Sequence, residues 1–100
     1  MDKPMTDSVP LEKWREVFPM LHQMVNRCPY IYFDNAATAL KPQSVIDAVT
    51  RFYSQEYATV HRGTYSKSIA ATHHYHSARE SIAEFINAAT PSEIIFTRGT

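Results

Sequence analysis

Two strand-like segments lie about 60 residues apart in this chain, and most of the residues between them are helical in pattern. Residues 30–33 are aromatic or β-branched, and residues 93–97 carry two isoleucines and a phenylalanine, as strands commonly do. Strands joined through helices are typical of α/β domains, but two strands alone make a poor self-sufficient sheet. The pattern therefore predicts an α/β fold that is incomplete in this chain, and we expect these residues to form the front of a larger domain.

Three stretches carry apolar residues at helical spacing. The first covers residues 10–18 and is ended by Pro19, the second covers residues 42–57, and the third begins near 66 or 68 and reaches about 87. The apolar faces that we expect to be buried are Val45, Ile46, Val49, Phe52 and Tyr53 in the second stretch, and Tyr75, Ala78, Ile82, Phe85 and Ile86 in the third. The segment between these two stretches, "ATVHRGTYSK", has no clear period and is predicted to be an ordered loop.

The residues after Pro19 have a weaker pattern. Asn26 and Arg27 predict a turn between two short extended pieces, since asparagine is common in turns. A continued helix is the alternative for this segment.

Charge and composition exclude several classes of partner. The chain has 10 Lys and Arg residues and 10 Asp and Glu residues, so its formal net charge is zero, whereas nucleic-acid binders usually carry a basic excess. Its apolar runs are far shorter than the roughly 20 residues needed to span a bilayer, and the N-terminus lacks the apolar core of a secretory signal. We expect no nucleic-acid partner, no membrane contact and a cytoplasmic location, with which the single cysteine, Cys28, is compatible.

The last residues, "FTRGT", are the first candidate for chemistry. A strand that leads into Gly99 and Thr100 can turn backbone N–H groups and a hydroxyl toward an anion, and a following helix would add a favourable dipole. An ordinary turn at the end of a strand is the alternative.

The loop "TVHRGTY" is the second candidate. His61 can stack on a flat ring or exchange a proton near neutral pH, and Arg62 can bind a carboxylate or phosphate through two N–H groups. Gly63 would let the backbone approach a ligand closely. A solvated loop without a ligand is the alternative.

Two further features favour structural roles. His73 and His76 lie three residues apart on the third helical stretch, but no Cys, Asp or Glu in the same turn completes a metal site. A solvated helix face explains them better, and no metal site is predicted. Cys28 has only Arg27 nearby to lower its pKa, so a structural thiol is the better interpretation.

Residues 34–38, "DNAAT", connect the first strand-like segment to the second helical stretch with small or polar side chains, where an ordinary linker would carry Gly or Pro. This hinge is the first of three motifs, "YFDNAATALKPQSVIDAVTRFY", "ATVHRGTYSKS" and "EIIFTRGT". Their order and separations resemble the N-terminal part of the class V aminotransferase family. The "VHRG" loop makes the chain most similar to the SUF-type cysteine desulfurases, which use pyridoxal phosphate (PLP).

This resemblance, which runs from about residue 11 to 100, implies a fold and a domain division. The fold is an α/β PLP-dependent transferase of fold type I, similar to aspartate aminotransferase and incomplete in this chain. Residues 1–28 correspond to an N-terminal arm and short helix, and residues 29–100 to the start of the large PLP-binding domain.

The resemblance also implies which residues lie at the site. Asn35, Ala36 and Ala37 lie against the active site of such enzymes, where short side chains leave room for the substrate and its carboxylate. Tight packing between strand and helix is a second reason for the alanines, and both reasons can hold. His61 and Arg62 would lie near the substrate and the cofactor.

For the cofactor, the resemblance implies that Gly99 and Thr100 begin the Gly-Thr-Thr turn that holds the phosphate of PLP. The sequence departs from the family pattern at Tyr65, where desulfurases often have a second histidine. A phenol can donate a hydrogen bond, and no proton-transfer role is assigned to that position.

No catalytic residue is predicted within these 100 residues. In the family, the lysine that forms a Schiff base with PLP, the aspartate at the pyridine nitrogen and the nucleophilic cysteine all come after the Gly-Thr-Thr turn. None of the four lysines sits in the matching His-Lys context, and Cys28 is not in the matching cysteine loop; the lysines are Lys3, Lys13, Lys41 and Lys67. The chain by itself is therefore expected to be inactive.

The function implied for the whole enzyme is removal of sulfur from L-cysteine. The products would be L-alanine and an enzyme persulfide that supplies iron–sulfur cluster assembly, in a homodimer that serves a sulfur-acceptor protein. A selenocysteine lyase or another class V lyase is one alternative. A non-catalytic product that at most docks to a partner is the other.

Overall fold

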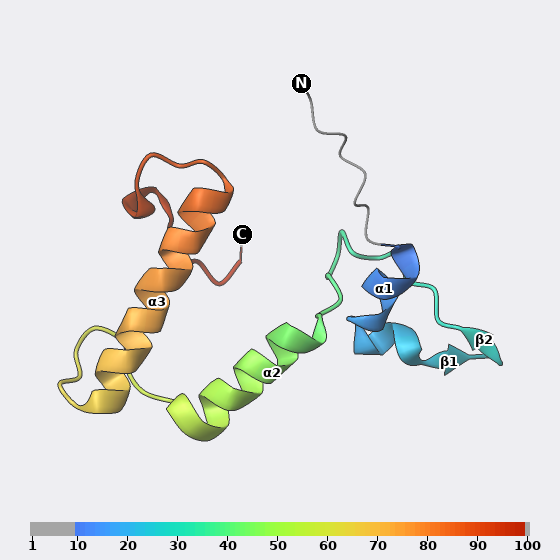
Figure 1. Cartoon of the computed structure of the whole chain (residues 1–100), viewed down its shortest axis with the longest axis horizontal. Coiled ribbons are helices and arrows are strands. Elements are labelled where there is room, and N and C mark those ends of the chain that lie inside the picture. Colours follow the sequence, from blue (N-terminus) through green and yellow to red (C-terminus); the bar gives the residue numbers. More distant parts are fainter. Residues whose placement is uncertain (1–9, 100) are drawn as a thin grey trace. The chain divides into compact units, whose positions relative to one another are not determined.

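The computed structural model describes residues 10–99 of the chain (Figure 1). The chain folds as two compact units, of which the first extends to Thr50 and the second begins at Arg51. Within residues 10–99, no helix combines the length and the apolar character needed to cross a membrane.

The first unit contains two helical segments, a small hairpin and a longer helix. Its elements are α1 (Leu11–Glu16), the 3-10 helix η1 (Pro19–His22), β1 (Met24–Val25), β2 (Cys28–Pro29) and α2 (Gln43–Arg51). Both helical stretches predicted here are confirmed, although α1 ends at Glu16 and Pro19 opens η1 instead of ending a longer helix. The residue before a proline avoids helical dihedrals, so α1 has to stop before Phe18. The N–H of Gln43 donates to the carbonyl of Val17 at 2.8 Å, which ties the start of α2 to the end of α1.

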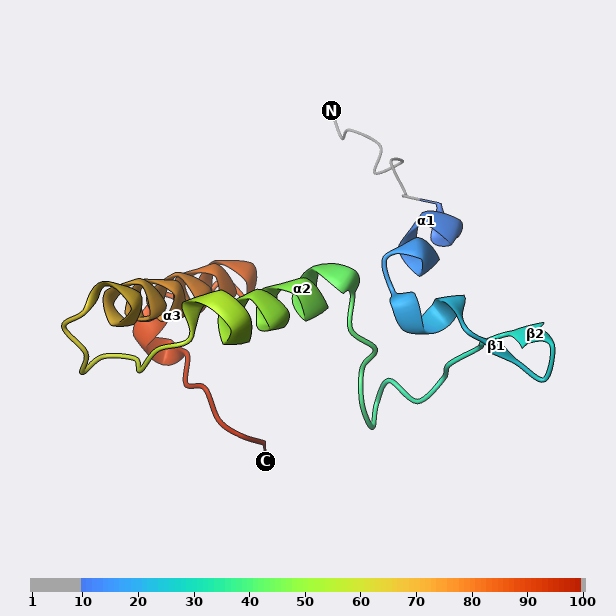
Figure 2. The same cartoon turned by 90° about the horizontal axis from the view of Figure 1, so that it is seen from below.

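The predicted turn at Asn26 and Arg27 is confirmed, and it joins β1 and β2 as an antiparallel hairpin (Figures 1 and 2). Both turn residues have positive φ, 51° for Asn26 and 65° for Arg27, as a type I′ turn requires. Val25 pairs with Cys28, and the N–H of Tyr30 extends the ladder to the carbonyl of Gln23 at 3.0 Å.

The second unit is built on α3 (Ser66–Phe85), with η2 (Phe52–Glu56) and η3 (Pro91–Glu93) packed against it. Its predicted helix and the ordered loop before it, residues 57–65, are confirmed. A Schellman motif ends α3, because Asn87 has a φ of 58° and the N–H of Ala88 donates to the carbonyl of Ala83 at 2.8 Å. The chain after η3 then crosses α3 (Figure 1).

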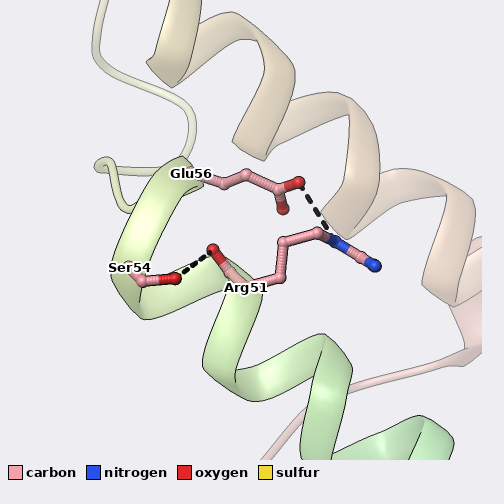
Figure 3. A network of polar contacts seen from close by, with 3 residues as sticks. All are labelled: Arg51, Ser54 and Glu56. Atoms are coloured by element: carbon pink, nitrogen blue, oxygen red, sulfur yellow. Dashed lines mark hydrogen bonds and ion pairs between the residues drawn. The ribbon is translucent and has the colours of Figure 1, made fainter.

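A π-helical turn, η2, follows α2 directly. Figure 3 shows its polar contacts: Arg51 Nε lies 3.3 Å from Glu56 Oε1, and the Ser54 hydroxyl donates to the Arg51 carbonyl at 3.5 Å. The rings of Phe52 and Tyr57 meet edge to face at 5.7 Å. These contacts close the wider turn locally, as an isolated π-turn needs.

The two predicted strands are wrong as elements of secondary structure. Within residues 10–99, neither 30–33 nor 93–97 is a strand: Glu93 closes η3, and the other residues of both segments run as irregular chain. A strand needs a run of hydrogen bonds to a neighbouring strand, and beyond the single bond of the Tyr30 N–H to the carbonyl of Gln23 the described residues offer no such ladder to either segment. Phe33 is 95% exposed and Ile95 is exposed as well, whereas Ile94 is buried and Tyr32 is half-buried.

The predicted buried faces also need correction. On α3, Tyr75 is half-buried as expected, but the fully buried positions are Ser68, Ala71 and Ala83, and Phe85 is 90% exposed. The segments that cover α3 lie close to its backbone, so small residues meet them and large ones do not. Along α2 and η2, the residues expected to form a buried apolar face are mostly exposed: Val45, Ile46 and Val49 on α2 and Tyr53 on η2 are exposed, and Phe52 on η2 is half-buried.

The hairpin turn supplies a test of local backbone strain. An L-residue in the left-handed region costs roughly 1–2 kcal/mol, and glycine adopts it freely. We expect Arg27→Gly to stabilise the hairpin by about 1 kcal/mol and to slow amide hydrogen exchange of Tyr30 by about fivefold. Arg98→Gly is the matched control, because Arg98 has no positive φ; equal or faster exchange of Tyr30 in Arg27→Gly would contradict the strain argument.

Candidate functional site

The hinge at residues 34–38 folds as one tight turn in the first unit. The carbonyl of Asp34 accepts the N–H groups of both Ala37 and Thr38, each at 3.1 Å. The side-chain oxygen of Asn35 accepts the N–H of Leu40 at 3.3 Å, as asparagine commonly does in turns. Asn35 is therefore a structural element of the hinge as well as a predicted substrate residue.

Tyr32 holds the same turn from outside. Its hydroxyl lies 3.1 Å from the carbonyl of Asp34 and also contacts the carbonyl of Thr38. Burial raises the pKa of the Tyr32 phenol above its ordinary value of 10.0, and the charges of Asp34 and Tyr30 raise it further. The phenol therefore keeps its proton, and with it the hydrogen bond, over a wider pH range than a free tyrosine does.

Two hollows border the hinge. The smaller, of about 170 Å³, is lined by Asn35 together with Arg15, Tyr32 and Leu40, among others. The larger, of about 440 Å³, is mainly apolar and lies beside Ala39, Leu40 and Lys41. Of the three hinge residues predicted to face a substrate, Asn35 lines a hollow, whereas Ala36 and Ala37 form the exposed outer part of the turn.

Deprotonation of Tyr32 gives a pH test of the hinge. Because the pKa of Tyr32 in the folded state lies above that of the unfolded chain, its contribution to stability is complete below about pH 10 and is lost as pH rises through the folded pKa. Tyr32→Phe should lower the free energy of unfolding at pH 7, because the hydrogen bonds of the phenol to the hinge are lost, and it should remove this alkaline loss.

NMR titration of the Tyr32 ring carbon, with urea unfolding at pH 7 and above pH 10, measures both effects. Tyr53→Phe is the control, because Tyr53 is exposed on η2. A Tyr32 pKa at or below 10 would contradict this account of the hinge.

In the second unit, the loop 57–65 is bound to the first turns of α3. Ser68 is completely buried, and its hydroxyl donates to the carbonyl of Thr59 at 2.7 Å. Gly63 lies directly against it: a Cβ at this position would stand 2.0 Å from Ser68 Oγ and 2.4 Å from Ser68 Cβ. Only glycine fits there. The sequence predicts a close approach of the Gly63 backbone to a ligand, whereas the close approach in the structure is to Ser68 of α3.

His61 sits at the centre of this loop in a strained conformation. Its φ is 72°, and the N–H of Arg62 donates to the carbonyl of Val60 at 3.0 Å, which defines a γ-turn with positive φ at its centre, a rare and strained type. A non-glycine residue in such a conformation costs on the order of 1–3 kcal/mol and persists only where its surroundings impose it, most often at functional sites.

The imidazole of His61 belongs to a cluster of rings on α3. It meets Tyr75 edge to face at 5.3 Å and His76 at 5.2 Å, and Tyr75 in turn meets Phe96 at 5.1 Å. The structure therefore brings the His61 loop and the segment that leads to Gly99 to the same helix. Arg62, next to His61, is exposed, so its guanidinium can reach an anion in solvent.

Gly99 lies at the end of the described chain. Its φ is 148°, a conformation that L side chains rarely adopt, and no atom lies within 4 Å of the place where a Cβ would stand. The backbone here is open to a close-approaching group such as a phosphate. Thr100, the second residue predicted to bind the cofactor, lies outside the described residues.

The remaining candidates gain no ligand-binding geometry. Within residues 10–99, no group of three His, Cys, Asp or Glu side chains is placed to hold a metal ion. Cys28 is exposed in β2. Tyr65, where the family pattern has a histidine, precedes α3 and its ring would lie 3.1 Å from a Cβ at Gly63.

Sequence reasoning missed Ser68 and Thr72, which hold the loop. Thr72 Oγ1 accepts the N–H of His61 at 2.8 Å. The available signal was two hydroxyl residues four apart at the start of a helix, which places them on one face. That spacing alone does not say what the face meets.

Gly63 supplies a test of the loop contact. Gly63→Ala should destabilise the second unit by about 1–3 kcal/mol, because the added methyl overlaps buried Ser68 and forces a shift. Urea unfolding of the second unit, probed by hydrogen exchange of the backbone amides of α3, measures the loss of stability. The neighbouring exposed change Thr64→Ala should alter stability by less than about 0.5 kcal/mol; a Gly63→Ala protein as stable as the Thr64→Ala control would rule out the close contact.

Comparison with known proteins assigns the family. Residues 31–100 match the family "Aminotransferase class-V". The chain belongs to this family. Cysteine desulfurases from Yersinia pseudotuberculosis serotype O:1b and Pectobacterium atrosepticum are each 50% identical to it over 93 residues, which are 93% of this chain and 23% of the relative.

A solved structure agrees with the sequence relatives. The apo cysteine desulfurase from Thermococcus onnurineus NA1 superposes with a TM-score of 0.74 at 37% identity, over 98% of this chain and 21% of that protein. The predicted fold class, the N-terminal part of a PLP fold type I α/β domain, is confirmed. The chain spans less than a quarter of the length of each of these relatives.

Proposed function

We propose that this chain supplies the N-terminal part of the substrate and cofactor site of a PLP-dependent cysteine desulfurase. The observation that carries the proposal is the strained, clamped backbone of His61, which lies in the motif that the sequence predicts to face the substrate. The likeness to cysteine desulfurases over nearly the whole chain supports it.

The residues present fit a PLP cofactor at one point. Gly99 has an open left-handed backbone, which suits hydrogen bonds from main-chain N–H groups to a phosphate. PLP, when bound, acts as an electron sink for bonds at the α-carbon of an amino acid. Gly99, with Thr100, would hold its phosphate.

The substrate side would be formed by the hinge and the loop. Asn35, Ala36 and Ala37 would leave room for L-cysteine and its carboxylate, because the turn carries short side chains. Arg62 would bind an anionic group through its guanidinium, and His61 would contribute a ring for stacking or proton exchange. In the whole reaction the sulfur atom of L-cysteine passes to an enzyme thiol, and L-alanine and an enzyme persulfide result.

The finer assignments follow the SUF-type resemblance. We propose iron–sulfur cluster assembly as the process, a homodimer as the active form, a sulfur-acceptor protein as the partner and the cytoplasm as the compartment. Selenocysteine lyase is the competing reaction, and rates with L-cysteine and L-selenocysteine on the same preparation separate the two.

The direct test uses the protein as its native gene encodes it, purified and supplied with PLP. We expect a PLP absorbance band that changes with L-cysteine, and formation of L-alanine and sulfide in equal amounts in the presence of a thiol reductant. A preparation that binds no PLP and consumes no L-cysteine would reject the enzyme assignment and favour the non-catalytic alternative.

His61 gives the sharper mutational test. His61→Ala should lower kcat/KM for L-cysteine by at least about tenfold, while unfolding of the second unit changes little, because the ring is exposed. His73→Ala, which changes an exposed histidine on α3, is the control and should retain full turnover. Unchanged turnover in His61→Ala would remove His61 from the site.

A further inference from the structure

The backbone of His61 is not held by the γ-turn itself. The turn contributes one hydrogen bond, from the N–H of Arg62 to the carbonyl of Val60, and the central residue still has a φ of 72°. Such a conformation relaxes in an isolated loop, so other contacts have to impose it. These contacts come from two hydroxyl side chains on α3.

Thr72 holds the turn at its centre. Its oxygen accepts the N–H of His61 at 2.8 Å, while its own hydrogen is donated to the carbonyl of Ser68 at 2.9 Å. The bond to Ser68 fixes the rotation of the hydroxyl, so that a lone pair faces His61. The acceptor is thereby oriented before any ligand binds.

Ser68 holds the loop two residues earlier. Its hydroxyl donates to the carbonyl of Thr59 at 2.7 Å, and the side chain is fully buried. Ser68 and Thr72 lie four residues apart, on one face of α3. Helix α3 therefore holds the loop at two points, at Thr59 before the γ-turn and at His61 at its centre.

The same helix also sets the direction of the imidazole. With the N–H of His61 bound to Thr72, the ring contacts both Tyr75 and His76, with interplanar angles of 81° and 66°. The backbone and the ring of His61 are therefore both held by the rigid helix α3. Attachment to a rigid element leaves a functional side chain little freedom.

We propose that Thr72 and Ser68 are positioning residues that hold His61 in its strained conformation and so present its imidazole to the substrate. The inference rests on the proposed function for its catalytic consequence. Its structural part, that the two hydroxyls impose the γ-turn, stands independently of any activity.

The test compares Thr72→Val, which keeps the shape and removes the acceptor, with Thr72→Ser, which keeps the hydroxyl. In Thr72→Val we expect amide hydrogen exchange of His61 to accelerate about tenfold, the NMR couplings that report its φ to move toward negative values, and the far-ultraviolet circular dichroism to stay unchanged. Thr72→Ser should keep exchange of the His61 amide within about threefold of the parent protein.

Ser68→Ala provides a second variant in case Thr72→Val does not fold. It leaves the carbonyl of Thr59 without this donor, and exchange of the His61 amide should again accelerate while Thr72 is intact. Unchanged φ couplings and exchange at His61 in Thr72→Val, or in Ser68→Ala if the former is unfolded, would overturn the proposal. Equal effects of Thr72→Val and Thr72→Ser would overturn it as well.

The catalytic part of the proposal is tested by the kinetics of the protein as its gene encodes it, supplied with PLP. Thr72→Val should lower kcat for L-cysteine by at least about tenfold at nearly unchanged KM, with rescue by Thr72→Ser. If the NMR changes occur but Thr72→Val and Thr72→Ser have the same kcat, the hydroxyls position His61 without serving the reaction. The catalytic part of the proposal is then overturned. If no variant, including the parent, consumes L-cysteine, the proposed function fails while the structural part is decided by NMR.

Discussion

The buried hydroxyl of Ser68 is the contact on which the candidate site of the second unit depends. It satisfies the carbonyl of Thr59 inside the loop, and its burial is possible only because Gly63 offers no side chain at the point of closest approach. An unsatisfied buried polar group costs about 1–3 kcal/mol, so the loop and helix α3 are fixed to one another as a pair. The γ-turn at His61 and its ring contact with Tyr75 lie in the loop that this pairing holds, and Phe96 contacts the ring of Tyr75 as well.

The hinge of the first unit is held by a different set of contacts. No glycine or proline sets the turn at residues 34–38; the carbonyl of Asp34, the amide of Asn35 and the phenol of Tyr32 organise it through hydrogen bonds. The small side chains of Ala36 and Ala37 keep the outside of the turn open. In both units, therefore, backbone groups are held by polar side chains beside positions that stay accessible to a ligand.

The large apolar side chains show a separate property of this family member. Phe33 and Phe85 are almost fully exposed in the described structure, although strand and helix patterns place both on faces that α/β domains cover. The second unit is stabilised instead by small residues under closely approaching segments. Its packing is therefore local, and the apolar faces expected from periodicity contribute little to it.

The sequence by itself determined the helices, the hairpin turn at Asn26 and Arg27, the ordered loop and the family, because these depend on local propensity, turn chemistry and the order of motifs. It did not determine strand pairing, because pairing needs hydrogen bonds between distant segments, and neither segment predicted as a strand is one in the described structure. Only the tertiary structure revealed that Thr72 accepts the N–H of His61 and that Ser68 donates to the carbonyl of Thr59, since helical spacing places two hydroxyls on one face but says nothing about the loop that face meets. Contacts between segments far apart in the chain are decided by close packing, and periodicity does not encode them.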